Sequence, residues 1–222
     1  VSPESGEAYA AALGRLISEQ GVDFLVPVNS KEIRVLVKFR QLLGGSLSYM
    51  ASSGMYDELD DKAAFSQLVD KAGLPQPKSY QTLDAPLPLV VKPSRGSSAT
   101  GVVYLTNEAE RAAFKLANPH SAGDHVIQEY VTGEGIGYSG FFKEGDPLVT
   151  YAHKRVAEYP VSGGSSAVRE RYPYADLPEL EALIKRLLEA APWSGFAMFE
   201  LKRRGPGDFV FIECNPRVWG SI

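Results

Sequence analysis

The chain is organised around three consecutive stretches, GFAMFELKRR (195–204), GPGD (205–208) and FVFIECNPR (209–217). Gly-Pro-Gly-Asp is typical of a tight turn, and the flanking apolar runs have the length of strands, so together they predict an antiparallel hairpin. Folding the chain about the four-residue turn pairs Arg204 with Phe209 and places Glu200 directly opposite Glu213. Directly opposed residues of an antiparallel pair have Cβ atoms about 5 Å apart. The hairpin therefore brings two carboxylates face to face.

Alternation along the two strands assigns the other side chains of the hairpin to two faces. Asn215 and Arg217 follow Glu213 at two-residue steps, so they share its face. The opposite face is expected to belong to the core, and it carries Ala197, Phe199 and Leu201 against Val210, Ile212 and Cys214.

The polar face of the hairpin is a candidate metal site. Opposed carboxylates repel each other unless a cation lies between them. Carboxylate and amide oxygens are the ligands that Mg²⁺ prefers, so Glu200, Glu213 and Asn215 are the candidate metal ligands. Arg217 can bind a phosphate from the same face.

Without a bound metal, the two carboxylates are expected to recruit a cation such as Lys62, Lys92 or Arg217, because bare opposed carboxylates raise each other's pKa. The hairpin also has a plainer interpretation, as a surface element with solvated charges. A bulge of one residue would shift the register and break the pairing of the carboxylates.

The composition is that of an ordinary globular protein. The 222 residues are 44% hydrophobic and 23% charged, and the net charge of -4 gives no reason to expect nucleic acid or an anionic membrane as partner. The single cysteine excludes an internal disulfide and a zinc–cysteine cluster, and the three histidines lack metal-ligand spacing. Neither a run of 18 apolar residues nor a signal peptide is visible, so a cytoplasmic protein is predicted. Because the chain starts at Val1 and not at Met, it is expected to be a fragment, and an upstream targeting segment is left open. A further strand and helix are expected upstream, since the N-terminal pattern fits only half of a doubly wound unit.

Before the hairpin, helix and strand patterns alternate. Residues 24–28 are expected to form a buried strand, as in half of a doubly wound α/β unit. A single helix is expected over 57–73, starting at the cap Asp57. Lys62 lies beside its apolar stripe, where a lysine that extends along apolar surface is the plain interpretation. Asp176 is expected to cap a later helix.

Two loops rich in small residues follow strands. Lys92 ends an apolar strand, and the loop after it carries Ser94, Ser97 and Ser98, whose backbone and hydroxyl donors suit a phosphate. A flexible hairpin is the alternative. The charged segment 153–160 leads into the Gly/Ser stretch 161–166, which suits a mobile segment that covers the substrate. A solvated sheet edge is the alternative there.

The order of several motifs resembles the ATP-grasp superfamily of ATP-dependent ligases, and in particular its carbamoyl-phosphate-synthase-like members. An Asp-Lys pair (61–62) opens a helix that ends in Ala-Gly-Leu-Pro-Gln-Pro, and the resemblance covers roughly residues 55–222. The other matching motifs are Val-Val-Lys-Pro-Ser (90–94), Ile-Gln-Glu-Tyr-Val-Thr-Gly (127–133), Arg-x-x-Glu-x-Pro-x-x-Gly-Gly-x-Ser (155–166), Phe-Glu-Leu-Lys (199–202) and Phe-Ile-Glu-Cys-Asn-Pro-Arg (211–217).

The resemblance implies a fold and a role for each matching residue. The fold class is α/β (α+β), with a partial N-terminal domain over 1–54, a small ATP-binding lobe over 55–131 and a C-terminal antiparallel-sheet lobe over 132–222. Lys62 and Lys92 would hold ATP phosphates, and Arg155 and Arg217 would be catalytic. The adenine hinge would be Gln128, Glu129, Tyr130 and Val131, the ribose ligand Glu134, and the metal ligands Glu200, Glu213 and Asn215.

The resemblance also implies an ADP-forming ligase that works through an acyl phosphate. Its cofactors would be ATP and one or two Mg²⁺ ions, for which Mn²⁺ can substitute. Its substrates would be a small carboxylate and an amine, and a homodimer is left open. Two alternatives remain, a kinase on the same fold and a nucleotide-binding module without turnover. Only reaction products would separate them, because a fold by itself does not fix an activity.

Overall fold

The computed structural model describes residues 2–47, 50, 52–96, 100–118, 125–159 and 165–219. Helices and strands alternate irregularly along the chain, and antiparallel strands dominate its second half. The elements in chain order are η1 (Pro3–Ser5), α1 (Glu7–Gln20), α2 (Ser30–Lys38), η2 (Arg40–Leu43), α3 (Ser53–Asp60), α4 (Lys62–Lys71), β1 (Ser79–Tyr80), β2 (Leu89–Pro93), β3 (Val103–Leu105), α5 (Glu108–Ala117), β4 (His125–Glu129), β5 (Glu134–Lys143), β6 (Asp146–Tyr159), β7 (Ser165–Arg171), α6 (Leu177–Ala190), β8 (Gly195–Gly205) and β9 (Asp208–Asn215).

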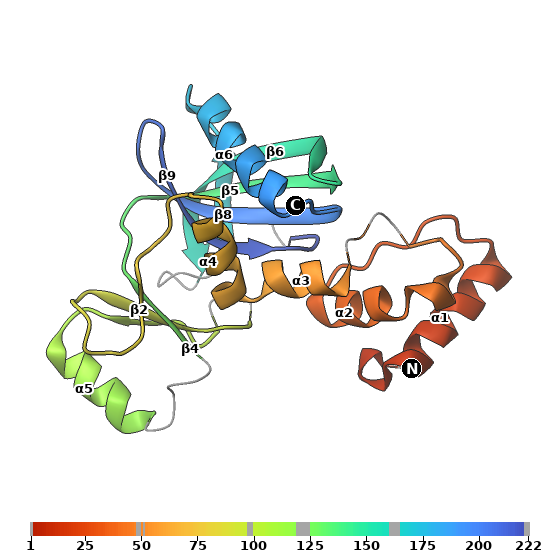
Figure 1. The fold of residues 1–222 in the computed structure, drawn as a ribbon, viewed down its shortest axis with the longest axis horizontal. Coiled ribbons are helices and arrows are strands. Elements are labelled where there is room, and N and C mark those ends of the chain that lie inside the picture. The colour runs from red at the N-terminus through yellow and green to blue at the C-terminus, as the bar shows by residue number, and fades with distance from the viewer. Residues whose placement is uncertain are drawn as a thin grey trace.

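Two antiparallel sheets make up the second half of the molecule (Figure 1). A small sheet has the strand order β1-β4-β2-β3, and its core consists of Leu89, Val91 and Leu105. A larger sheet has the order β7-β6-β5-β8-β9, and it shares the main core with α3, α4, α6 and one side of α2. The predicted mixed α/β class is confirmed. No helix in the described ranges is long and apolar enough to span a bilayer.

The N-terminal part differs from its prediction. Its helices α1 and α2 form a separate small core with η2, at the end of the molecule opposite α5 (Figure 1). The expected strand at residues 24–28 is wrong in part, since Leu25 makes a single parallel bridge to Leu47 and Phe24 is 57% exposed. Among the described residues no sheet flanks this segment, so only Leu25 and Pro27 are shielded from solvent, Leu25 by the small core of α1 and α2. The boundaries at residues 54 and 131 stay a prediction.

The helix predicted over 57–73 is two helices, α3 and α4, which meet at Asp61. Asp61 has extended backbone angles, φ -86° and ψ 121°, and its carboxylate accepts hydrogen bonds from the backbone N–H groups of Ala63 and Ala64. An aspartate in this role starts a new helix, because it satisfies N–H groups that the helix itself leaves unpaired. The prediction of Asp57 as the cap is therefore wrong, and Lys62 becomes the first residue of α4.

The register of the β8–β9 hairpin is confirmed at its central pair, Glu200 opposite Glu213. The predicted pair of Arg204 with Phe209 is wrong, because Arg203 faces Phe209 instead. Two irregularities, between Glu200 and Leu201 and between Arg203 and Gly205, shift the register by one and then restore it. In the part of β9 between these two irregularities, the residues predicted to face the core face the other way, and the reverse, since side chains alternate along a strand. Consequently Phe209 and Phe211 join the main core, rather than Val210 and Ile212.

Candidate active site

The two glutamates of the hairpin point toward one amide. Asn215 donates from Nδ2 to Oε1 of Glu200 at 3.3 Å and to Oε1 of Glu213 at 3.4 Å. The carboxylates therefore converge on a single point, as alternation along the strands predicted. Each side chain is about one fifth exposed, with 19% for Glu200 and 20% for Glu213, so the carboxylates lie at the wall of an open space rather than inside the core.

Cations from two other elements balance the carboxylates. Arg155 of β6 donates from Nη1 to Oε2 of Glu200 at 2.7 Å, and Lys62 Nζ lies 3.5 Å from Oε2 of Glu213. Arg217 donates from Nη2 to Oδ1 of Asn215 at 2.9 Å. The prediction that the carboxylates recruit a cation is confirmed for Lys62, and Arg155 is a second one that the prediction did not include.

The electrostatics of Glu200 fit a site that gains from a bound cation. Burial, followed by the charge of Glu213, raises the pKa of Glu200 to about 7, although Arg155 opposes the shift. Two carboxylates and an amide oxygen are the donor set of Mg²⁺ rather than of zinc. No group of three His, Cys, Asp or Glu that could hold a metal occurs in the described residues. Mg²⁺ would bind Asn215 through Oδ1, so the amide would turn and release Arg217.

Lys92 approaches the same hairpin from the small sheet. It is 5% exposed and donates from Nζ to the backbone oxygen of Ile212 at 3.3 Å. Burial lowers the pKa of Lys92 to about 8, and the charge of Glu213 works against this shift. Burial disfavours the charged form of a lysine at this depth, and an anion bound beside it would favour that form.

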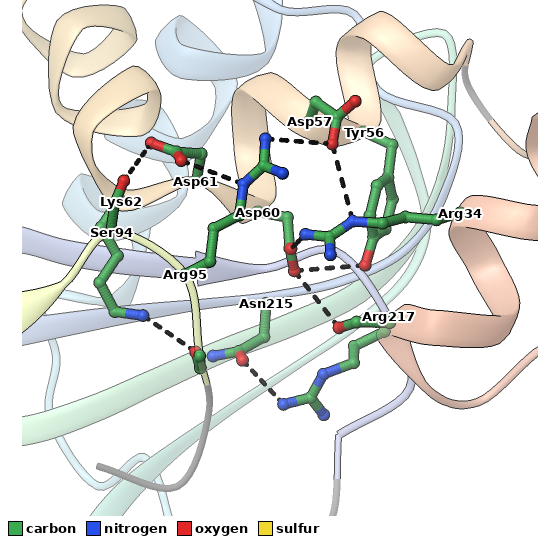
Figure 2. A network of polar contacts seen from close by, with 12 residues as sticks. Arg34, Tyr56, Asp57, Asp60, Asp61, Lys62, Ser94, Arg95, Asn215 and Arg217 are labelled. Atoms are coloured by element: carbon green, nitrogen blue, oxygen red, sulfur yellow. Dashed lines mark hydrogen bonds and ion pairs between the residues drawn. The ribbon is translucent and has the colours of Figure 1, made fainter. Parts of the chain in front are cut away.

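Lys62 and the loop after β2 are joined by short contacts (Figure 2). Lys62 donates from Nζ to the backbone oxygen of Gly96 at 2.9 Å, and its backbone N–H donates to the oxygen of Ser94 at 2.8 Å. Asp61 accepts from the Ser94 hydroxyl at 2.7 Å and from Arg95 Nε at 3.2 Å. Ser94 thus fastens the loop to the cap of α4. Its hydroxyl is engaged there, so its predicted phosphate contact stays a prediction.

Ser97 and Ser98, together with the Gly163-Gly164 stretch, lie outside the described residues. Their predicted roles at the phosphates and over the substrate stay predictions.

A cavity of 1320 Å³ connects the hairpin with the end of β4. Ligand pockets commonly measure about 300–1,000 Å³, so this one has room for a nucleotide and a second small molecule. Lys62 borders a smaller recess next to it, which Glu213 also lines. The predicted site residues that line the large cavity are Lys92, Gln128, Glu129, Tyr130, Val131, Glu134, Arg155, Glu200, Glu213, Asn215 and Arg217.

The predicted hinge has its side chains fixed by the small sheet. Gln128 is 3% exposed and donates from Nε2 to Ser79 at 3.2 Å. Glu129 accepts at Oε1 from the backbone N–H of Lys78 at 3.1 Å. Tyr130 packs edge-on against Tyr104, with ring centroids 5.6 Å apart, and both line the cavity. This end of the cavity is lined by aromatic side chains, as suits a planar base.

Glu134 lines the cavity, but its carboxylate is already engaged. Its Oε1 lies 2.5 Å from Lys154 Nζ and accepts from the Tyr174 hydroxyl at 2.7 Å. Arg203 Nη1 lies 3.5 Å from Oε2. Hydrogen bonds from Lys154 and Tyr174 lower the pKa of Glu134. A ribose would have to compete with these partners, so the predicted ribose contact stays a prediction.

Glu158 and His153 are two of the cavity residues that the sequence did not predict. Glu158 Oε1 lies 3.2 Å from Arg155 Nε, so Arg155 is held between Glu158 and Glu200. The sequence signal for Glu158 was its position three residues after Arg155. The strand β6 has register shifts between these two residues, which bring both side chains to the same place. His153 lines the cavity beside Gly137. The sequence signal for it was the occurrence of Gly135 and Gly137 in β5, where they leave room for side chains of the neighbouring strand.

Comparison with known proteins identifies the family of the chain. A sequence model of the ATP-grasp domain matches residues 59–221. The chain belongs to the ATP-grasp family. The predicted ATP-grasp fold is therefore confirmed, and a search of curated proteins found no match.

Solved structures agree with the ATP-grasp assignment. Biotin carboxylase from Campylobacter jejuni is similar at TM-score 0.75 and 14% identity, over 96% of this chain and 52% of that one. D-alanine–D-alanine ligase from Bacillus anthracis has TM-score 0.66 and 20% identity, over 94% and 75%. L-amino acid ligase from Bacillus licheniformis has TM-score 0.70 and 18% identity, over 97% and 54%. The chain spans about half the length of the biotin carboxylase structure, and identities this low show the fold alone.

Proposed function

We propose that this ATP-grasp protein is an ATP- and Mg²⁺-dependent ligase that forms ADP, phosphate and a carbon–nitrogen bond. The observation that supports this most is the convergence of Glu200 and Glu213 on one point, with Lys62 and Arg155 in contact with their outer oxygens. The carboxylates and the cations that pair with them are both concentrated where the terminal phosphate of a nucleoside triphosphate would lie. The solved relatives named above include two ligases that differ widely in sequence from this chain.

The chemistry needs positioning and charge neutralisation rather than a protein nucleophile. A carboxylate oxygen of the substrate attacks the terminal phosphorus of ATP, and ADP leaves with the bond's electron pair. An amine then attacks the acyl carbon, loses a proton and displaces phosphate. In-line phosphoryl transfer of this kind depends on cations and geometry. Magnesium, bound by Glu200, Glu213 and Asn215, would neutralise charge on the phosphate oxygens.

The chain's own side chains divide this work by position. Lys92 comes from the small sheet and Lys62 from the start of α4, where they would hold the phosphates against the hairpin. Arg155 reaches the site from β6, where it would contact the oxygens that gain charge as the acyl phosphate forms. Arg217 would take a phosphate oxygen once Asn215 turns toward the metal. The hinge, from Gln128 to Val131, would carry the adenine.

The test is a screen for ADP release with Mg-ATP, in which single and paired amino acids and small carboxylates are added to the full chain. A ligase releases ADP and phosphate only when a carboxylate and an amine are both present, and mass spectrometry then finds the amide. ADP with one substrate and a stable phosphorylated product would instead identify a kinase. Binding of Mg-ATP without turnover in any mixture would favour a nucleotide-binding module.

Binding itself is checked by thermal unfolding. A ligand that binds only the native state stabilises it by about 2.7 kcal/mol at a hundredfold excess over Kd. Mg-ATP is therefore expected to raise the unfolding temperature, and ATP with EDTA to raise it less. If millimolar Mg-ATP leaves the unfolding temperature unchanged, the proposed function fails at its first step.

A further inference from the structure

His153 is a buried side chain in the wall of the cavity that the chemistry above does not use. It is 1% exposed, yet it lines the cavity, and its Nδ1 is enclosed without a hydrogen-bond partner among the described residues. Buried polar atoms are nearly always paired, so an unpaired one calls for a reason. Since Nδ1 is enclosed, Nε2 is the ring nitrogen left to meet a ligand in the cavity.

The backbone of β5 is shaped for this ring. Gly137 pairs with His153 on one side and with Glu200 on the other, so these three residues form a row across the sheet. A Cβ atom at Gly137 would lie 2.2 Å from Cε1 and 2.6 Å from Nε2 of His153, closer than any real contact. The imidazole therefore lies across β5 in the direction of Glu200, in space that only a glycine leaves open.

A second glycine does the same for Arg155. A Cβ atom at Gly135 would lie 3.0 Å from Cδ of Arg155, whose guanidinium reaches Glu200 two strands away. The two glycines together let two neighbouring side chains of β6 cross β5 toward the carboxylates. Glycine inside a strand weakens the strand, so its presence at both positions indicates that the space it leaves open is needed.

The charges around His153 favour an anion and a neutral ring. Arg169 of β7 lies directly opposite Arg155, and like charges in that position destabilise a sheet. Glu158 and Glu200 offset this repulsion at Arg155, and a bound oxyanion would offset it further. Burial, followed by Arg169 and Arg155, lowers the pKa of His153 to about 4. A neutral imidazole carries a single N–H. Because Nδ1 is enclosed without a partner among the described residues, an N–H there would stay unsatisfied, so we place the N–H on Nε2, where a ligand in the cavity can accept it.

We propose that His153 contacts the substrate, and that its neutral ring donates from Nε2 to an oxygen of a bound oxyanion. The oxyanion is a carboxylate of the acceptor substrate or a phosphoryl oxygen, since both present the same acceptor beside Arg155. The identity of this ligand rests on the proposed function, whereas the donor itself rests on the cavity, the glycines and the unpaired nitrogen.

The direct test is nitrogen NMR of the histidine rings in the ¹⁵N-labelled protein. The chain has three histidines, so the spectrum of His153→Gln assigns the His153 signals. The free protein is expected to show His153 as the neutral tautomer with the proton on Nε2. Mg-ATP, inorganic phosphate and acetate are then added separately. A shift of Nε2 with Mg-ATP or phosphate identifies a phosphoryl oxygen, and a shift with acetate alone identifies a carboxylate.

Matched variants test the donor without relying on turnover. The amide of Gln occupies the place of Nε2, and the amide of Asn that of Nδ1. His153→Gln is expected to keep the affinity for the responding probe within about threefold, whereas His153→Asn and His153→Phe lose about tenfold or more, the effect of one hydrogen bond to a charged group. Gly137→Ala is expected to displace the ring signals, while Gly205→Ala, which meets nothing within 4 Å, is not.

Two outcomes would overturn the inference. One is a His153 signal that no probe moves although Mg-ATP binds by calorimetry, which leaves the proposed function intact. The other is equal affinity for the probe in the Gln, Asn and Phe variants. If Mg-ATP fails to bind but phosphate or acetate still shifts Nε2, the proposed function fails and the donor assignment stands. If nothing binds and nothing shifts, both fail.

Discussion

Two polar clusters lie on the same five-stranded sheet, and they are built in opposite ways. The tyrosine network consists of Tyr172, Tyr174, Asp176, Arg203, Glu134 and Lys154. Asp176 accepts from the Tyr172 hydroxyl at 2.6 Å, from the backbone N–H of Gly207 at 2.8 Å and from Arg203 Nε at 2.9 Å. Every carboxylate in this network faces donors.

The carboxylate cluster consists of Glu200, Glu213, Asn215, Lys62, Lys92 and Arg155. In it two carboxylates lie opposite each other on neighbouring strands, although Lys62 and Arg155 pair with one carboxylate each. The pKa values separate the two clusters. Burial opposes the shift at Asp176, but its hydrogen bonds still lower its pKa, whereas the pKa of Glu200 is raised to about 7. Groups whose charges are satisfied stabilise a fold, and groups whose pKa values are pushed toward neutrality are typical of functional sites.

The largest expected effect is the loss of Mg-dependent nucleotide binding in Glu213→Gln. Removing one of two opposed carboxylates takes away a metal ligand and a repulsion together. Affinity for ATP in Mg²⁺ is expected to fall about tenfold or more and turnover about a thousandfold, which is within the range for a site built on charge stabilisation. The free energy of unfolding is expected to stay unchanged or to rise by about 1 kcal/mol.

Calorimetry with ATP in Mg²⁺ and in EDTA measures the first effect, and urea unfolding measures the second. Glu189→Gln on the exposed face of α6 is the control. A stable protein that binds ATP in Mg²⁺ as tightly as the parent would contradict the metal site.

Asp176→Asn is expected to be the most destabilising change in the tyrosine network. The Asp176–Arg203 pair is buried, with side chains 8% and 11% exposed, and breaking such a pair costs about 3 kcal/mol or more. The parent is expected to be more stable than Asp176→Asn at any pH above the ordinary aspartate pKa. This difference in stability is lost as the pH falls through the lowered pKa of Asp176. Urea unfolding between pH 3 and pH 7 checks both statements. Equal stability at pH 7 would show that the network contributes nothing.

Lys92→Met is expected to stabilise the protein while removing phosphate binding. The folded pKa of about 8, against 10.5 when solvated, means that the buried charge costs about 3 kcal/mol at pH 7. A methionine of similar length avoids this cost but loses the hydrogen bond to Ile212. The net gain in the free energy of unfolding of Lys92→Met is expected to be about 2 kcal/mol. Between about pH 8 and pH 10.5 the unfolded chain binds more protons than the folded one, so the stability of the parent rises with pH. The stability difference between Lys92→Met and the parent is therefore expected to narrow over this range. A destabilised variant would mean that Lys92 is well paired.

The smallest effect is expected at the tip of the hairpin. Arg204 and Asp208 form a surface pair at 2.9 Å, with side chains 48% and 46% exposed. Exposed pairs contribute about 0–1 kcal/mol, so Arg204→Ala is expected to change the free energy of unfolding by less than about 0.5 kcal/mol. Unfolding at low and high salt is the check. A loss above 1 kcal/mol would show that the turn itself depends on this pair.

The hairpin and its metal face could be predicted from the sequence, because their causes are local. A turn of known length fixes which residues oppose each other, and alternation along a strand fixes which share a face. Glu200, Glu213 and Asn215 lie within 16 consecutive residues, and the structure brings them together as expected. The order of motifs was likewise enough to indicate the ATP-grasp fold. Bulges were the exception, since they depend on packing and leave no mark in the periodic pattern.

Only the tertiary structure decided which distant residues complete the site. Lys92 and Ile212 are 120 positions apart, and Arg155 and Glu200 are 45 apart, so no local rule joins them. Likewise the burial of His153 over Gly137, the engagement of Ser94 by Asp61 and the exposure of Phe24 follow from which elements pack together. The physical reason is that periodicity fixes the direction of a side chain within its own element, whereas its partners, its desolvation and hence its pKa are set by the elements packed against it.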